Sequence, residues 1–323
     1  MQRSSTAVTA QHLLRRLRAD ERRGARALAL LGARVLARLL AEPGGSGWEA
    51  RLARGTAALL RGQAAMAPLL VLANAVWLAL ERPGAPSARR AAALVALAGA
   101  RARLEEAPAR VAAAAVRLHR TARTVVTISN SSTVLAALTG LAARRPLRVI
   151  VGEGRPALEG RGLARWAARV GCRVTLVPDA ALPGEVGGAD AVLVGADALV
   201  GSAAINKVGT YPLVLAARHA RVPASLLADR SKCVPKALTP LLRLTPRDPR
   251  SLWASPPSGV AVARTDFERV PLSLVTAVVT EDGPTSPQAL VRRLAALPAS
   301  RLLRRWVRQG PPGGQRRAGA GRR

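Results

Sequence analysis

Charged, amide and hydroxyl side chains follow the short apolar runs in the second half of the chain. They are Ser129-Asn130-Ser131-Ser132-Thr133, Arg155, Gly195-Ala196-Asp197, Asn206-Lys207-Val208-Gly209-Thr210 and Lys232. Cations and free backbone N–H groups at helix N-termini bind phosphate, and a carboxylate among cations is a candidate proton carrier. The pattern therefore predicts a site of the sugar-phosphate type, with the segment from Gly195 to Thr210 at its centre.

Each of these residues also has a simpler structural explanation. Asp197 fits a turn or a helix cap, and Arg155 fits a surface ion pair. Ser131 and Thr133 fit helix N-caps. Their joint occurrence at successive strand ends nevertheless favours a ligand site. Lys and Asn are rare in this chain, with three residues of each, so the adjacent pair Asn206-Lys207 is itself a sign of function.

Five β-type runs must position these side chains. They cover residues 125–129, 148–151, 173–177, 191–194 and 225–228, with helices expected near 131–143, 160–170 and 210–220. Continuous apolar strands that alternate with helices indicate a parallel sheet covered on both faces. The carboxyl ends of such strands share one edge of the sheet, where ligands bind. A late strand over 274–279 is expected to join the same sheet.

Residues from about 8 to 118 predict helices only. Apolar residues recur at helical spacing from Leu13 to Leu40, and helices are expected near 48–62, near 66–80, from Ser87, and over 109–120 after a break at Pro108. The fold class is therefore α/β, with an N-terminal helical domain (1–118) followed by a Rossmann-like parallel α/β sheet domain (119–300). A basic tail (301–323) is expected to be disordered.

The chain of 323 residues has a formal net charge of +31, which by itself suggests a polyanionic partner. Only three of its 50 basic residues are lysines, and a GC-rich genome would produce the same excess of Arg and Ala. We therefore interpret most of the charge as coding bias. We favour a solvated tail, with contact to RNA or DNA as the alternative.

Neither secretion nor a membrane anchor is indicated. Cys172 and Cys233 are the only cysteines, too few for a disulfide framework, and arginines interrupt the N-terminus before any apolar signal-peptide core. The uncharged stretch 62–80 contains Gln63, Pro68 and Asn74 and predicts a buried helix rather than a membrane span. We expect a cytoplasmic protein without a metal or a cofactor.

Three motifs resemble one known superfamily. They are Val151-x-Glu153-x-Arg155-Pro156-x-x-x-Gly160, the Gly195-Ala196-Asp197 turn and Asn206-Lys207-Val208-Gly209-Thr210. The superfamily contains the ribose-1,5-bisphosphate isomerases, the methylthioribose-1-phosphate isomerases and the alpha, beta and delta regulatory subunits of translation initiation factor 2B. The run Thr276-x-x-x-Thr280-Glu281-Asp282-Gly283 is similar to its closing strand. The resemblance covers about residues 120–283.

The resemblance implies roles for individual residues. In the isomerases, a Cys after the first strand and the Asp of the Gly-Ala-Asp turn move protons between neighbouring carbons and oxygens. The matching positions here are Ser129 and Asp197. The expected substrate- and phosphate-binding residues are Arg23, Gly24, Ala25, Ser131, Ser132, Thr133, Arg155, Asn206, Lys207 and Lys232. A homodimer or higher oligomer is implied as well.

The chain departs from the isomerases at the catalytic thiol. Where they read Thr-His-Cys-Asn, this chain reads Thr127-Ile128-Ser129-Asn130. A serine hydroxyl needs a neighbouring base, which Ile128 cannot supply. Three interpretations stay open. The chain is an aldose–ketose isomerase of the ribose-1,5-bisphosphate or methylthioribose-1-phosphate type, or it is a non-catalytic relative, either a sensor of a phosphorylated pentose or nucleoside monophosphate or a regulatory protein similar to the initiation factor 2B subunits. The third interpretation is a protein that associates with RNA or DNA through its basic surface.

Overall fold

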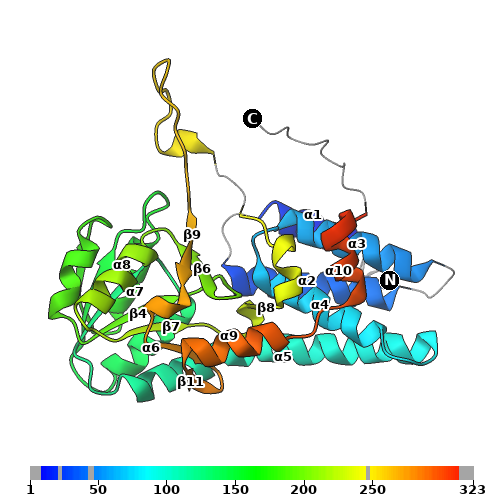
Figure 1. The fold of residues 1–323 in the computed structure, drawn as a ribbon, viewed down its shortest axis with the longest axis horizontal. Coiled ribbons are helices and arrows are strands. Elements are labelled where there is room, and N and C mark those ends of the chain that lie inside the picture. The colour runs from blue at the N-terminus through cyan, green and yellow to red at the C-terminus, as the bar shows by residue number, and fades with distance from the viewer. Residues whose placement is uncertain (1–8, 21–23, 43–46, 245–247, 313–323) are drawn as a thin grey trace, which may run out of the picture. The chain divides into compact units, whose positions relative to one another are not determined.

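The computed structural model describes residues 9–20, 24–42, 47–244 and 248–312. They form two compact units (Figure 1). The helical unit comprises Met1–Leu104, Val234–Arg243 and Leu297–Arg323, and the sheet unit comprises Glu105–Cys233 and Leu244–Ala296. The boundaries of these units differ from those of the expected domains, because two later segments of the chain return to the helical unit.

The helical unit is built on a leucine-rich core. Its helices are α1 (Ala10–Arg18), α2 (Ala25–Ala41), α3 (Trp48–Gly62), α4 (Ala67–Leu80), the first part of α5 (Pro86–Leu118), the 3-10 helix η3 (Lys236–Leu241) and α10 (Arg301–Gln309). The expected helices near 48–62 and 66–80 are confirmed. Helix α4 is buried on nearly all sides, as its uniformly apolar sequence predicted. Among the described residues, no helix combines the length and apolarity needed to cross a membrane.

The expected break at Pro108 is wrong. Helix α5 is 33 residues long and runs through Pro108 without a break. A proline inside a helix removes one backbone hydrogen bond and strains the preceding turn. Here Leu104 and Val111, on either side of it, are buried in hydrophobic cores. Burial of these flanking turns outweighs the local loss.

The sheet unit contains a seven-stranded sheet in the order β11-β10-β7-β4-β1-β2-β3. The strands are β1 (Thr124–Ile128), β2 (Arg148–Gly152), β3 (Arg173–Val177), β4 (Ala191–Gly195), β7 (Ala224–Leu227), β10 (Ala277–Thr280) and β11 (Gly283–Thr285). All neighbouring pairs are parallel except β10 with β11. Helices α6 (Ser132–Ala142), α7 (Gly160–Arg169), α8 (Thr210–His219) and α9 (Pro287–Ala296) accompany the strands. The predicted parallel α/β architecture is confirmed.

A second, four-stranded sheet was not predicted. It has the order β8-β5-β6-β9 and contains β5 (Ala198–Val200), β6 (Ala203–Lys207), β8 (Cys233–Val234) and β9 (Phe267–Pro271). Strands β5 and β6 form an antiparallel hairpin that starts directly after the Gly195-Ala196-Asp197 turn. These runs are too short for their periodicity to be distinguished from loops.

Residues 301–309, which the sequence assigned to the basic tail, form α10. Ser300 caps the helix with its hydroxyl, and Leu303 and Trp306 are buried. The spacing of three residues between Leu303 and Trp306 is typical of a helix, but the many arginines around them obscured it in the sequence. Residues 313–323 of the expected tail lie outside the described residues.

Candidate functional site

The loops after β1 and β4 lie where the strand order of the seven-stranded sheet reverses. From β1 the chain proceeds to β2 and β3 on one side, and from β4 to β7 and β10 on the other. Ligands bind at such switch points because the two loops diverge. A Cβ atom on Gly195 would lie 2.7 Å from the Ser131 hydroxyl oxygen. The two loops are therefore in direct contact, and only glycine allows this approach.

The first loop ends at the N-terminus of α6. The Ser131 hydroxyl caps this helix by accepting a hydrogen bond from the Val134 N–H, 3.4 Å away. Thr133 is buried and Ser132 is exposed. Ser129 is half-buried and has a φ of 67°, in the left-handed region that non-glycine residues rarely occupy. Strained backbone at this position is a common property of functional loops.

Asp197 stands at the junction between β4 and β5. Its backbone N–H donates to the carbonyl oxygen of Ile205 at 2.8 Å, which starts the β5–β6 hairpin. Burial raises the pKa of the Asp197 carboxyl group; the nearby charge of Glu159 raises it as well, whereas Lys232 and Lys207 lower it. The net direction is upward, so this carboxyl group is easier to protonate than an exposed aspartate.

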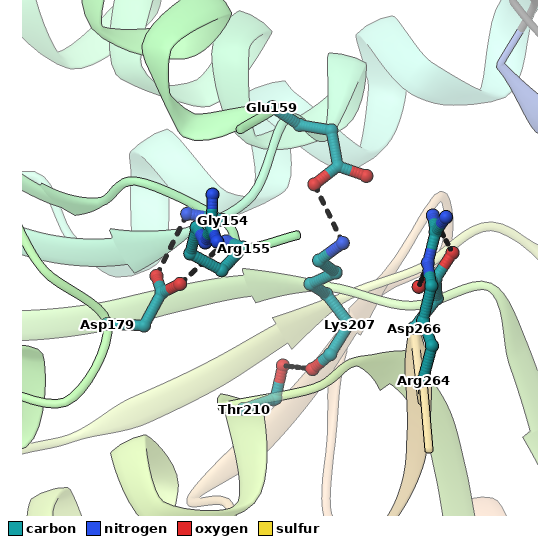
Figure 2. A network of polar contacts seen from close by, with 8 residues as sticks. All are labelled: Gly154, Arg155, Glu159, Asp179, Lys207, Thr210, Arg264 and Asp266. Carbon is teal, nitrogen blue, oxygen red and sulfur yellow. Dashed lines mark hydrogen bonds and ion pairs between the residues drawn. The ribbon is translucent and has the colours of Figure 1, made fainter. Parts of the chain in front are cut away.

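The hairpin returns Asn206 and Lys207 to the same edge. Lys207 is only 3% exposed, and its Nζ lies 2.8 Å from Oε2 of Glu159 (Figure 2). Glu159 precedes α7 and is 37% exposed. The two atoms attract as opposite charges but do not meet the geometry of a hydrogen bond, and neither hydrogen-bonds to another described residue. The sequence did not single out Glu159, because it occupies an unspecified position of the motif that ends at Gly160.

The side chain of Asn206 is hydrogen-bonded within the turn that follows it. Its side-chain amide donates to the Thr210 hydroxyl at 2.9 Å. This hydroxyl donates to the carbonyl oxygen of Lys207 at 2.6 Å, as Figure 2 shows. Gly209 has a φ of 97°, and a Cβ there would lie 2.7 Å from Cδ1 of Ile128. Ile128 thus fills space against this turn, and Asn206 holds Lys207 in position.

The loop after β2 is held by Asp179. Its two carboxylate oxygens accept hydrogen bonds from the backbone N–H groups of Gly154 and Arg155, at 2.9 and 2.7 Å (Figure 2). The side chain of Arg155 is exposed. Asp179 therefore shapes the loop, and Arg155 remains available to a ligand.

Lys232 enters from the loop after β7. Asp229 caps the short helix η2 (Arg230–Lys232) by accepting from the Ser231 N–H at 2.8 Å. Lys232 is half-buried, and its charge acts on Asp197. The pKa of the adjacent Cys233 is raised to about 12, mainly by burial and to a smaller extent by the negative charges of Glu281 and Asp229. The thiol of Cys233 therefore stays protonated at neutral pH.

A second ion pair, Arg264 with Asp266, was also missed from the sequence. The two side chains make hydrogen bonds of 2.8 and 3.0 Å, and they are 16% and 11% exposed (Figure 2). The backbone of Asp266 accepts from the Val208 N–H at 3.0 Å, which ties this segment to the Lys207 turn. No local sequence motif marks this pair, because the turn to which it is tied, at Val208, lies more than fifty residues earlier in the chain.

Three expected residues are not among this group. Arg23 lies outside the described residues, and Gly24 and Ala25 lie in the helical unit at the start of α2. All other expected site residues belong to the sheet unit. Among the described residues, no group of three or more His, Cys, Asp and Glu side chains is arranged to hold a metal ion.

Known proteins resemble this chain in sequence. Ribose 1,5-bisphosphate isomerase of Archaeoglobus fulgidus is 33% identical over 170 residues, covering 51% of this chain and 54% of that protein. Methylthioribose-1-phosphate isomerase of Chloroflexus aurantiacus is 35% identical over 162 residues, 47% of each. 5-deoxyribose 1-phosphate isomerase of Moorella thermoacetica is 33% identical over 186 residues, 54% of this chain and 53% of that one. The matches span about half the length of these relatives.

Solved structures share the fold over most of the chain. Translation initiation factor eIF-2B of Pyrococcus horikoshii OT3 matches with a TM-score of 0.73 and 26% identity, covering 87% of this chain and 98% of that one. The tetrameric eIF2B-beta2-delta2 complex of C. thermophilum matches with a TM-score of 0.71 at 18% identity, covering 88% and 93%. A sequence model of the initiation factor 2 subunit family matches residues 22–287. The chain belongs to the initiation factor 2 subunit family.

Proposed function

We propose that this protein binds a phosphorylated pentose at the carboxyl edge of its seven-stranded sheet and converts it from aldose to ketose. The observation that supports this most is the environment of Asp197, which lies within electrostatic reach of Lys207 and Lys232 and whose pKa is raised by burial. A raised pKa brings a carboxyl group closer to neutral pH, which suits proton transfer. The relatives named as pentose-phosphate isomerases are consistent with it.

The N-terminus of α6 and the nearby cations are the proposed phosphate site. Helix N-termini present free N–H groups and a positive dipole end to an anion. Ser131, Ser132 and Thr133 surround this end, and Lys232 and the exposed Arg155 supply charge. Lys207 and Glu159 form a donor and acceptor pair suited to sugar hydroxyl groups.

Only one proton carrier is needed if the hydrogen on C2 of a sugar 1-phosphate moves directly to C1. Protonated Asp197 gives its proton to the ring oxygen as the bond from C1 to that oxygen breaks. The hydrogen on C2 then shifts with its electron pair to C1, and the C2 hydroxyl proton passes to Asp197 as the ketone forms. Asp197 ends protonated as it began, so Ser129 is not required as a base.

This route predicts a labelling result. Deuterium placed on C2 of the substrate should appear at C1 of the ketose without exchange into water. We expect the Asp197→Asn variant to lose about 10² to 10⁴ in rate, measured by NMR of ketose formation. Glu106→Gln, an exposed carboxylate in α5, is the matched control and should retain full activity.

The substrates to test are those of the relatives: ribose-1,5-bisphosphate, methylthioribose-1-phosphate and 5-deoxyribose 1-phosphate. Absence of ketose from all three, beside an isomerase that carries the catalytic cysteine, would reject the enzymatic proposal for these substrates.

The second candidate is a non-catalytic sensor of a phosphorylated pentose or a nucleoside monophosphate. It is favoured by Ser129 and Ile128 at the positions of the catalytic Cys and His, and by the protonated state of Cys233. It predicts thermal stabilisation by such ligands without turnover. Ser129→Cys, alone and with Ile128→His, should then create turnover. Loss of an existing wild-type turnover in Asp197→Asn would instead exclude the sensor.

A further inference from the structure

The positive charge is distributed unequally between the two units. The helical unit contains 27 Lys and Arg residues and 5 Asp and Glu residues, whereas the sheet unit contains 23 and 14. The helical unit is the smaller of the two, yet it carries +22 of the formal charge of +31. The excess comes both from added arginines and from missing carboxylates.

Coding bias does not account for this difference. A GC-rich genome favours Arg over Lys throughout a gene, and both units are encoded by the same gene. Asp and Glu each have a codon ending in C or G, so such a genome does not remove them from one unit alone. The depletion of carboxylates in the helical unit therefore has a local cause.

Helix α10 carries a regular stripe of this charge. The helix has four arginines, and all of them are exposed. Three of them stand three, four and seven residues after the first: Arg301, Arg304, Arg305 and Arg308. This spacing places them on one face of the helix, over a length of about 10 Å. None of the four makes an ion pair with a described residue. The opposite face buries Leu303 and Trp306.

The stripe opposes the stability of its own helix. Like charges three and four residues apart destabilise a helix by about 0.2–0.5 kcal/mol per pair, and a cation in the first turn opposes the helix dipole. The fold nevertheless anchors α10 firmly. The Ser300 N–H donates to Asn74 Oδ1 at 2.9 Å, and the Leu302 N–H donates to Glu81 Oε1 at 3.1 Å. The arginines are therefore presented from a fixed platform.

We propose that the arginine stripe of α10, with the basic helical unit around it, binds the phosphodiester backbone of a nucleic acid. A stripe of about 10 Å spans about three phosphates of one strand at an axial spacing of 3.4 Å. No Trp, Tyr or Phe is exposed in the described part of the helical unit, so base stacking is not available. The binding is therefore electrostatic, independent of base sequence, and best suited to a duplex.

An anionic membrane is the weaker fit for this surface. Amphipathic helices bind membranes by burying their apolar face in the lipid. The apolar face of α10 is already buried within the protein through Leu303 and Trp306. The proposal concerns the helical unit and is independent of catalysis at the sheet edge.

The test measures binding of the full chain to fluorescently labelled duplex RNA, duplex DNA and vesicles that contain an anionic phospholipid. The variant replaces the stripe with glutamine, which keeps the helix propensity: Arg301→Gln, Arg304→Gln, Arg305→Gln and Arg308→Gln together. The matched control removes four exposed arginines of the sheet unit: Arg144→Gln, Arg165→Gln, Arg169→Gln and Arg173→Gln together. Both variants change the net charge equally.

We expect the stripe variant to bind duplex at least tenfold more weakly. The slope of log affinity against log salt concentration should fall by about 2.7, which is about 0.9 for each of about three lost phosphate contacts. The control should change neither quantity by more than a small fraction of this. Comparison of RNA with DNA then distinguishes the two sources of the phosphodiester.

Three outcomes would overturn the proposal. They are equal losses in the stripe variant and the control, tighter binding to the vesicles than to either duplex, and no wild-type binding to duplex. A third variant guards against a structural artefact, because replacing the four stripe residues with lysine keeps their charge. This variant should retain most of the affinity. A loss as large as that with glutamine would contradict electrostatic binding.

Discussion

Asp197 combines a negative charge with an environment that disfavours it. Burial and Glu159 raise its pKa, and the two lysines compensate only in part. The mechanism proposed above uses this property, because a proton donor and acceptor must exchange its proton readily near neutral pH. The same environment has a consequence for stability that can be measured without a substrate.

The Asp197→Asn variant should be more stable than the wild type at pH 7. Because the folded-state pKa is raised, Asp197 contributes most to stability below the unfolded-state pKa of about 3.9. This contribution is lost as the pH rises through the folded-state value. The amide has no charge to desolvate, so the advantage of the variant should grow with pH and vanish in acid. Urea denaturation at a series of pH values measures it.

Glu106→Gln serves as the control for this series, since Glu106 is exposed. Its free energy of unfolding should follow the wild type within about 0.5 kcal/mol. A wild type that is more stable than Asp197→Asn at pH 7 would show that the lysines, rather than burial, dominate at Asp197.

At the scale of elements, the start of α7 is pressed against the end of β2. A Cβ atom on Gly160 would lie 1.8 Å from the carbonyl oxygen of Gly152, and the Gly160 N–H donates to the Glu153 carbonyl oxygen at 3.0 Å. The atom that a Cβ at Gly160 would strike belongs to the backbone, so it cannot rotate away as a side-chain atom can. This contact places Glu159 and the Arg155 loop at the sheet edge, so the proposed ligand binding depends on it.

Gly160→Ala should therefore destabilise the protein by about 1–3 kcal/mol, the usual cost of overpacking, and weaken stabilisation by phosphorylated pentoses. Gly187→Ala is the matched control, because a Cβ at Gly187 meets nothing within 4 Å. Its effect should stay within about 0.5 kcal/mol. Urea denaturation and thermal shift with ligand report the two effects. Equal behaviour of the two variants would show that α7 can move without loss.

The elements were predictable where their patterns are long or buried. The five apolar runs of the parallel sheet and helices α3 and α4 fall within one or two residues of their expected limits. The β5–β6 hairpin was missed because β5 has only three residues and β6 ends in the polar pair Asn206-Lys207. The continuity of α5 at Pro108 was missed because it depends on what the flanking turns bury.

At the scale of the whole molecule, the resemblance implied a homodimer, which stays a proposal. Tyr211 and Leu215 stand four residues apart on α8 and are 39% and 45% exposed. Adjacent exposed apolar side chains on one helix face are typical of an interface. Helix α8 is therefore our candidate contact between two copies of the chain.

Sedimentation of the wild type should give twice the mass of the chain, and Leu215→Glu should shift it toward the single mass, because a carboxylate cannot be buried there without a partner. Val95→Glu is the control, since Val95 on α5 is 73% exposed. A monomeric wild type would refute the dimer, and an unchanged Leu215→Glu dimer would exclude α8 as its interface.

The amino-acid sequence by itself determined the parallel sheet and the edge at which most of the candidate site residues gather. Carboxyl ends of parallel strands meet at one edge whatever the details of packing, so the residues after each strand could be grouped without coordinates. The family motifs around Arg155, Asp197 and Lys207 are local, and local patterns are visible in sequence.

Only the tertiary structure decided the electrostatics of the site and the distribution of charge. The pairing of Lys207 with Glu159 joins residues 48 positions apart, and the raised pKa of Asp197 depends on burial by several segments. The basic face of α10 emerged only when the chain beyond Leu297 joined the helical unit. Each of these properties arises from contacts between distant residues, and no local spacing encodes such contacts.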